Sequence, residues 1–486
     1  MTVLRGARLD GSLVDVRLEN GRISDILPAG AADAGEGTID LDGRWLLPGL
    51  WDHHVHFDQQ ALALRRVDLS GAASAAEAAR TMSGHLSRLR LAPGQPIVGH
   101  GFRDGLWPDA PTLALLDAAV PGAPAVLVSA DLHCCWLNTP ALALYGRAGH
   151  PTGVLREDDC FDVVGRLGDV PTSTLDDWVA EAASAAAARG VVGVTDLEMT
   201  DNTASWSRRF TAGFDVLRIE AGIYTSHLDA AVAAGHRTGD AIQAASGTPG
   251  AGLLTVGPFK VLTDGSLNTR TAYCVDAYPG TQEHGLLTVS PENLVPLLRT
   301  AWSAGIHPAV HAIGDEANRL ALDAFETVGC RGRIEHAQLV RVEDIPRFAA
   351  LGVTASVQPE HAMDDRDIAE HYWAGRTGRA FALRSLLDAG ATLLLGSDAP
   401  VSPLDPWVTL SAAVTRSRDG REPWHPEQSI SVGEALAAST HSTVAVGEVA
   451  DLVAVDRDPF AASGDELRTM PVALTLLAGR TTHTAL

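Results

Sequence analysis

Several features that mark other classes of protein are absent from this sequence of 486 residues. No run of 18 uncharged apolar residues occurs, which argues against a membrane span, and the N-terminal segment lacks the apolar core of a secretory signal. Basic residues are few, because 37 Lys and Arg face 60 Asp and Glu and leave a net charge of −23. So acidic a surface repels phosphate backbones. We therefore expect a cytoplasmic protein that binds neither nucleic acid nor a membrane.

Cysteine is also scarce, and its spacing excludes two further kinds of site. The number of cysteines is odd and none of them forms a C-x-x-C pair. This pattern argues against a disulfide framework and against a zinc–thiolate site, and it fits a reducing compartment. No G-x-G-x-x-G motif follows a candidate strand, which counts against a doubly wound nucleotide-binding sheet. The five cysteines are Cys134, Cys135, Cys160, Cys274 and Cys330.

The two ends of the chain are rich in short β-type segments. Residues 1–47 alternate apolar and polar side chains, and Glu19-Asn20-Gly21 has the composition of a hairpin turn. The segments 451–456 and 472–479 show strand patterns as well. We therefore predict that residues 1–47 and 446–486 meet in one small β domain.

Between these ends, candidate strands alternate with alanine-rich helical segments such as 176–189 and 315–327. This rhythm predicts an α/β fold, a (β/α)₈ TIM barrel over residues 48–445, with an open doubly wound sheet as the alternative. The eight candidate strands are residues 51–56, 191–196, 214–223, 254–262, 306–311, 332–336, 352–357 and 392–397.

One long interval interrupts the rhythm after the first candidate barrel strand. Residues 62–160 are far longer than a single crossover helix, and they carry strand-like runs of their own at 95–102 and 123–130. We interpret this interval as an inserted subdomain near the barrel mouth, where loops that contact a substrate belong.

The candidate chemistry begins with His54 and His56, which lie two positions apart on a predicted strand. Positions i and i+2 face the same side of a strand, and two converging imidazoles suit a metal ion. A pair of polar residues at a strand end is the alternative. Other polar residues lie in or directly after later strands, and in a barrel these strand ends share one rim, which favours a metal site. These residues are Lys260, His311, His336 and Asp398.

These motifs together resemble the amidohydrolase superfamily, in particular the branch that contains N-substituted formamide deformylases and many metal-dependent hydrolases. The resemblance covers nearly the whole chain. The matching segments are Leu47–His56, Lys260 with Asp264-Gly-Ser, Arg270-Thr-Ala, Val310–Asp315, Arg333–Gln338, Ser356–His361, Leu395–Val401 and Ala450–Asp456.

This resemblance implies a barrel flanked by a β-sandwich domain, with a site for two metal ions that are usually zinc. His54, His56 and Asp398 would hold one ion, and His311 and His336 would hold the other. A single ion is the alternative, and iron, manganese or cobalt would accept the same ligands as zinc.

In the family pattern, Lys260 would bridge both ions as a carbamate formed with carbon dioxide, which removes its positive charge and supplies two oxygens. A lysine in a salt bridge beside a single metal ion is the alternative. Metal-activated hydroxide would attack the substrate carbonyl, while Asp398 acts as general base and then as general acid toward the departing nitrogen. The alternative is that Asp398 is only a metal ligand and takes no part in proton transfer.

The resemblance favours a hydrolase that cleaves a C–N bond of a small molecule, namely an N-acyl or N-formyl amide. The same centre would also suit a cyclic imide, a carbamate, a lactone or deamination at a ring carbon, because the fold does not choose among these bonds. A metal-free scaffold protein is the non-enzymatic alternative. Barrels of this kind are commonly dimers, so a homodimer is one expectation.

Further residues are expected around this centre with smaller roles. Asp264 and Asp315 are expected to orient the lysine or the histidines, and Glu335 is expected to point to the opposite face from His336 and to be structural. The candidates for substrate contact on the rim or in the insertion are Arg270, His361, Gln358 and His133.

Overall fold

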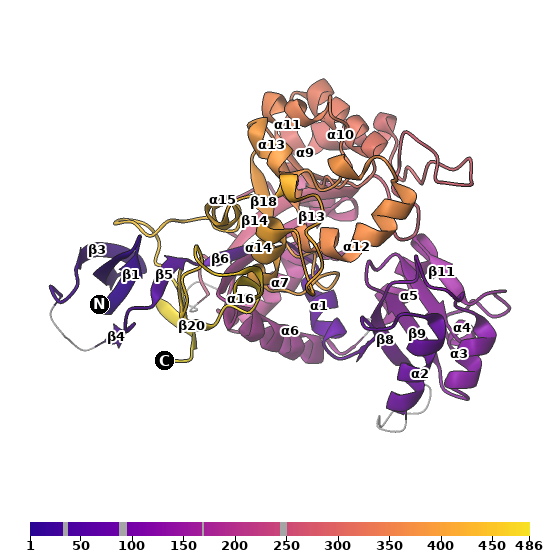
Figure 1. Ribbon diagram of the computed structural model, residues 1–486, viewed down its shortest axis with the longest axis horizontal. Helices are drawn as coiled ribbons and strands as arrows, with labels where there is room; N and C mark the ends of the chain where they lie inside the picture. The colour runs from indigo at the N-terminus through magenta and orange to yellow at the C-terminus, as the bar shows by residue number, and fades with distance from the viewer. Residues whose placement is uncertain (33–36, 87–94, 168–169, 244–249) are drawn as a thin grey trace.

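The protein is described by a computed structural model that covers residues 1–32, 37–86, 95–167, 170–243 and 250–486. The strands from both termini lie at one end of the molecule, the barrel occupies the middle, and the insertion lies at the other end (Figure 1). Within the described ranges, no helix is long and apolar enough to cross a membrane.

The barrel prediction is confirmed, because eight parallel strands form one sheet in the order β18-β17-β16-β15-β14-β13-β12-β6. Each of the eight segments expected from the sequence contains one of these strands, with ends shifted by a few residues. The strands are β6 (Leu50–Val55), β12 (Val191–Asp196), β13 (Arg218–Tyr224), β14 (Leu254–Leu262), β15 (Pro308–Ala312), β16 (Gly332–His336), β17 (Val353–Val357) and β18 (Leu393–Leu395).

The two edge strands of this sheet meet through the segment that follows β18. Val55 forms a parallel bridge with Ala399, the amide of Asp398 donates to the carbonyl of His54 at 2.7 Å, and the amide of His56 donates to the carbonyl of Ala399 at 2.8 Å. The hydrogen bonds that close the barrel therefore also bring Asp398 beside the two histidines.

Helices cover the outside of the barrel. Apolar residues at alternate strand positions, such as Val310, Ile334 and Ala355, are fully buried against these helices. The helices around the barrel are α1 (Phe57–Ala63), α6 (Thr172–Ala187), α7 (Asn202–Thr211), α8 (Leu228–Ala233), α9 (Pro291–Ser303), α10 (Asp315–Val328), α11 (Ile345–Leu351), α12 (Pro359–Tyr372), α13 (Leu383–Asp388), α14 (Pro406–Thr415), α15 (Val432–Ala437) and α16 (Gly464–Arg468).

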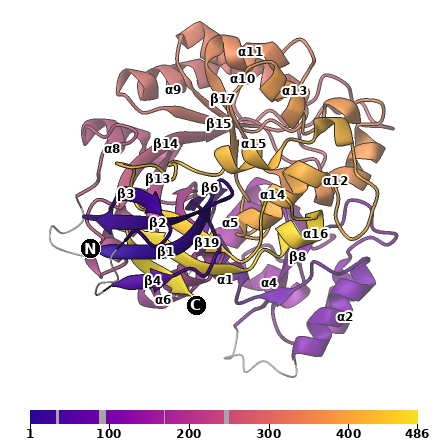
Figure 2. The same cartoon turned by 60° about the vertical axis from the view of Figure 1, so that its left-hand side comes forward.

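Both termini contribute to one sheet, as the sequence predicts (Figure 2). Asn20 and Gly21 have φ values of 51° and 76°, which form the tight turn between β2 and β3. β5 pairs with β19 and joins the two ends of the chain. The strands are β1 (Thr2–Leu9), β2 (Ser12–Glu19), β3 (Arg22–Pro28), β4 (Thr38–Asp40), β5 (Trp45–Pro48), β19 (Leu452–Val455), β20 (Val472–Leu477) and β21 (Arg480–Thr484), the last of which the sequence did not indicate.

The insertion has its own five-stranded sheet in the order β11-β10-β9-β8-β7 and its own buried core. Its residues Phe102, His133 and Phe161 line the same cavity as His56 of the barrel, so it does lie at the barrel mouth. Its elements are β7 (Val67–Asp68), α2 (Ala75–Leu86), β8 (Ile97–Phe102), α3 (Leu113–Ala119), β9 (Ala125–Ser129), β10 (Cys134–Leu137), α4 (Thr139–Leu144), β11 (Val154–Arg156) and α5 (Asp158–Leu167).

Candidate metal centre

The first group of candidate ligands consists of His54, His56 and Asp398, which the structure brings together as the sequence suggests. The Oδ1 atom of Asp398 lies 3.2 Å from Nε2 of His54 and 3.3 Å from Nε2 of His56. Burial favours the neutral carboxyl, yet the neighbouring histidines, led by His54, hold the pKa of Asp398 well below its ordinary value. Asp398 is therefore an ionised carboxylate that faces two imidazoles.

Glu335 contacts this group directly, and the expectation that it points away from the site was wrong. Its Oε2 atom lies 2.8 Å from Nδ1 of His54, and both side chains are fully buried. The expectation failed because strict alternation ends at His336, whose φ is 72°. Glu335 and His336 therefore both reach the centre, and Glu335 fixes the orientation of the His54 ring.

A second group brings His336 and His361 to Asp398. Ligand atoms of these three residues lie within 4.8 Å of one another, and Nε2 of His361 is 3.8 Å from Oδ2 of Asp398. His361 lies in the first turn of α12, which begins two residues after β17 ends, so the start of the helix places it at the rim. The sequence assigned His361 to substrate, whereas its position also makes it a candidate ligand for a metal ion.

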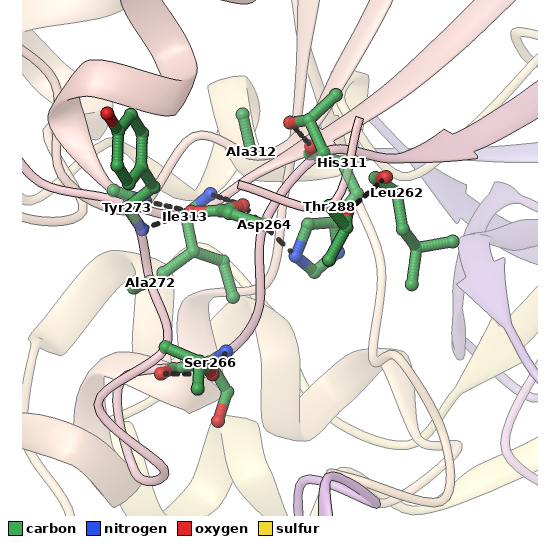
Figure 3. A network of polar contacts seen from close by, with 12 residues as sticks. Leu262, Asp264, Ser266, Ala272, Tyr273, Thr288, His311, Ala312 and Ile313 are labelled. Atoms are coloured by element: carbon green, nitrogen blue, oxygen red, sulfur yellow. Dashed lines mark hydrogen bonds and ion pairs between the residues drawn. The ribbon is translucent and has the colours of Figure 1, made fainter. Parts of the chain in front are cut away.

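His311 lies beside the second group, with its ring centroid 4.5 Å from that of His336. Asp264 is held by three backbone amides, those of Tyr273, Ile313 and Gly314, and its Oδ1 lies 3.4 Å from Nε2 of His311 (Figure 3). This position is the one expected for a carboxylate that orients His311.

Lys260 lies on β14 between these groups and is the only lysine in the sequence. Its Nζ atom lies 3.4 Å from Nε2 of His54, and the residue is 1% exposed. Burial lowers the pKa of Lys260 to about 8, so the neutral amine is more accessible than in a solvated lysine.

These residues fit a divalent metal ion. Nδ1 of His336 and Nε2 of His361 are buried without a hydrogen-bond partner among the described residues. Burial also lowers the pKa of His54 to about 4 and holds those of His311 and His336 well below their ordinary range. Neutral imidazoles beside an ionised carboxylate are the ligand set that zinc and related ions take.

The centre lies in a cavity of about 420 Å³ between the barrel and the insertion. Its base contains His56, Lys260, His311, His336, His361 and Asp398. Its walls include Phe102, Leu132 and Phe161 from the insertion, so a substrate would contact both parts of the chain.

His133 brings a ring of the insertion close to this centre, with its centroid 6.4 Å from that of His311. Its Nδ1 atom lies 2.8 Å from Oε2 of Glu157, and Oε1 of Glu157 accepts from Thr269 at 3.0 Å and from Thr271 at 2.7 Å. The two threonines follow β14, so Glu157 links the insertion to the barrel and fixes the His133 ring. No motif in the sequence pointed to Glu157.

We expect Glu157→Gln to lower kcat/KM for the substrate about tenfold, because a charge-assisted hydrogen bond that orients His133 is lost. Metal content should stay unchanged, since neither residue is a candidate ligand. Asp159→Asn is the matched control, because Asp159 lies two residues further along the chain at the start of α5 and forms an exposed ion pair with Arg147. An unchanged kcat/KM in Glu157→Gln would contradict this role for His133.

Three other residues expected near the centre do not line its cavity. Arg270 is exposed over the ring of Tyr372. Gln358 is buried beside the centre, with its Nε2 atom 3.3 Å from Nδ1 of His54, and contacts this ring from outside the cavity lining. Asp315 binds the amide of Val275 and the guanidinium of Arg379, and among the described residues it contacts no candidate ligand.

This fold and this centre place the protein in the class of barrel hydrolases that depend on divalent metal ions. The sequence profile of the amidohydrolase family matches residues 37–483. The chain therefore belongs to the amidohydrolase family, and it is a metal-dependent hydrolase.

Individual relatives agree with this assignment. The chain is 27% identical to an N-substituted formamide deformylase of Arthrobacter pascens, over 93% of this chain and 90% of the relative. It is 29% identical to the protein LONG AFTER FAR-RED 3 of Arabidopsis thaliana, over 84% of this chain and 75% of that protein. The crystal structure of an uncharacterized metal-dependent hydrolase from Pyrococcus horikoshii OT3 matches with a TM-score of 0.77 and 26% identity, over 96% of this chain and 99% of that one.

Proposed function

We propose that this protein hydrolyses the C–N bond of an N-formyl or N-acyl amide of a small molecule. The observation that carries the proposal is the convergence of two ligand groups on Asp398 at the base of one cavity. The similarity to an N-substituted formamide deformylase over most of both chains supports the choice of an amide. Water adds to the carbonyl carbon, the C–N bond breaks, and a carboxylate and an amine are released.

When bound, divalent metal ions, with zinc as the first candidate, lower the pKa of a coordinated water and polarise the substrate carbonyl. His54, His56 and Asp398 would hold one ion, and His336 with His311 or His361 would hold another. The carboxylate of Asp398 accepts the proton of the attacking water and returns it to the departing nitrogen, which leaves as a neutral amine.

We also propose that Lys260 is carboxylated. The Lys260 ammonium first loses one proton to solvent, and the Nζ lone pair then attacks carbon dioxide. As the N–C bond forms, a second proton leaves, so the cation becomes an anion with two oxygens. Its position beside His54, with His336 and His311 lining the same cavity, supports a bridging role.

Because Lys260 is the only lysine, its modification can be read without ambiguity. Protein equilibrated with ¹³C-bicarbonate and zinc should show a single carbamate carbon resonance that is absent from Lys260→Arg. A fully metal-loaded, active protein without this resonance would overturn the carbamate and leave the hydrolase proposal intact. The N-terminal amine is the one other amine that could react, and acetylation of the N-terminus removes it as a source.

Removal of metal is expected to abolish hydrolysis and to lower the unfolding temperature. A ligand that binds only the native state stabilises it, by about 4 kcal/mol at a thousandfold excess over Kd. Elemental analysis before and after dialysis against dipicolinate, followed by addition of zinc, manganese, iron or cobalt one at a time, measures metal count and identity. Hydrolysis of N-formyl amines by protein free of metal would contradict the proposed function.

A further inference from the structure

Several acidic side chains line the cavity outside the metal centre, of which Asp58 pairs with Arg209 and Asp131 accepts hydrogen bonds from Ser129 and Ser266. Besides Asp398, the lining includes the four acidic residues Asp58, Asp131, Glu198 and Asp365. Glu198 is buried and accepts hydrogen bonds from the side chain and amide of Gln59 and from the amide of Met199. Among the described residues it forms no ion pair.

Cationic side chains are few in the same lining. Among the described residues that line the cavity, Lys260 belongs to the metal centre and Arg103 is the remaining lysine or arginine. The guanidinium of Arg103 donates to Oδ2 of Asp364 at 2.8 Å and to the carbonyl of Val401 at 3.3 Å. A substrate carboxylate would therefore find the positive charge of Arg103 already engaged.

Asp365 lines the same cavity. It follows His361 by four residues on α12, so both side chains lie on one face of the helix, with their backbones about 6 Å apart along its axis. No hydrogen bond joins the Asp365 carboxyl to another described residue. Burial raises the pKa of Asp365 to about 7, so above that pH it presents a negative charge to the cavity one helical turn from His361.

One part of the wall is apolar and accommodates a hydrophobic group. Side chains from α1, the insertion, α6 and the segment after β12 contribute to it, and most are buried or half-buried. They are Leu62, Leu132, Phe161, Val164, Leu175 and Met199.

We propose that the cavity selects amides whose nitrogen substituent is apolar and without negative charge, and that it rejects amides with a carboxylate on that substituent. The apolar wall buries the substituent, while Asp365 and Glu198 repel an anion that Arg103 cannot neutralise. The inference rests on the proposed function for the bond that is cleaved, and it adds the class of substrate.

A matched pair of ligands tests the charge preference apart from catalysis. N-Methanesulfonylphenylalanine and its primary amide differ in charge but hardly in shape, and neither contains an amide bond at the position that would be cleaved. Calorimetric titration into the metal-loaded protein at pH 8.5 should show the primary amide binding at least about tenfold more tightly than the acid. Equal or tighter binding of the acid, or binding of neither, would overturn the proposal.

Asp365→Asn should reduce the ratio of the affinities for the primary amide and the acid at least about threefold, because the acid should bind more tightly to this variant. Asp367→Asn is the matched control on the same helix, because Asp367 is exposed and pairs with Arg421 at the surface. An undiminished difference in Asp365→Asn would remove Asp365 from the account, whereas an equal narrowing in Asp367→Asn would show that the effect is not local.

Kinetics with N-formylphenylalanine and its primary amide separate this inference from the proposed function. A higher kcat/KM for the primary amide than for the acid supports both the proposed function and the charge selection. If neither compound is hydrolysed while the sulfonamide pair keeps its preference, the proposed bond is wrong and the charge selection stands. If the acid is hydrolysed as efficiently as the amide, the proposed bond stands and the charge selection is wrong.

Discussion

Asp398→Asn is expected to lower kcat for an N-formyl amide about a thousandfold or more. The substitution keeps the shape of the side chain, and the amide of residue 398 can still donate to the carbonyl of His54 at 2.7 Å. It removes the negative charge that lies 3.2 Å and 3.3 Å from the imidazoles of His54 and His56. It also removes the group that we propose to accept the proton from water.

Activity, metal content and thermal unfolding should be measured on the same preparation. A loss of kcat with metal retained would assign Asp398 chiefly to proton transfer, whereas a parallel loss of metal would assign it chiefly to ligation. Asp388→Asn, an exposed aspartate that pairs with Arg384 at the end of α13, is the control and should behave as wild type. Retention of more than about a tenth of the wild-type kcat in Asp398→Asn would contradict its catalytic role.

The barrel was predictable from the sequence because buried parallel strands are continuous apolar runs separated by amphipathic helices. The candidate ligands were predictable for a related reason. His54, Lys260, His311 and Asp398 lie in or directly after such runs, and the carboxyl ends of the strands share one rim.

What the sequence did not reveal depends on local departures from regular geometry and on contacts across the fold. Glu335 was misplaced because side chains alternate only while the strand continues, and the positive φ of His336 ends that regularity. Glu157 belongs to the insertion and gains its role from Thr269 and Thr271, which are more than a hundred residues further along the chain. Pairings of this kind carry no signal in a single sequence.

Glu335 is the residue for which the structure changes the expectation most. It lies between the ring of His54, at 2.8 Å, and the guanidinium of Arg333, at 2.5 Å, in a fully buried position. We expect Glu335→Gln to weaken metal binding by about 10- to 100-fold, as for other residues that orient a ligand. The free energy of unfolding of the metal-free protein should fall by about 3 kcal/mol, because Arg333 would be left buried without its counter-charge.

Competition with a chelator measures the metal affinity, and thermal or urea unfolding of the metal-free protein measures the stability. Glu220→Gln is a matched control, since Glu220 lies on β13 and accepts a hydrogen bond from Thr195, and among the described residues it contacts no candidate ligand. A Glu335→Gln protein with the metal affinity of Glu220→Gln would show that Glu335 does not orient His54.

The pH dependence of stability gives an independent check on Glu335. Burial favours the protonated acid, but Arg333 and His54 hold the pKa of Glu335 far below its ordinary value. A depressed pKa in the folded state means that the carboxylate contributes stability above the ordinary glutamate pKa of about 4.3, and that this contribution is lost as the pH falls toward the folded value. Glu335→Gln lacks the contribution at every pH. The difference in unfolding free energy between wild type and variant should therefore be constant near neutral pH and should become smaller in acid. A difference that does not depend on pH would show that the loss of stability comes from packing and not from charge.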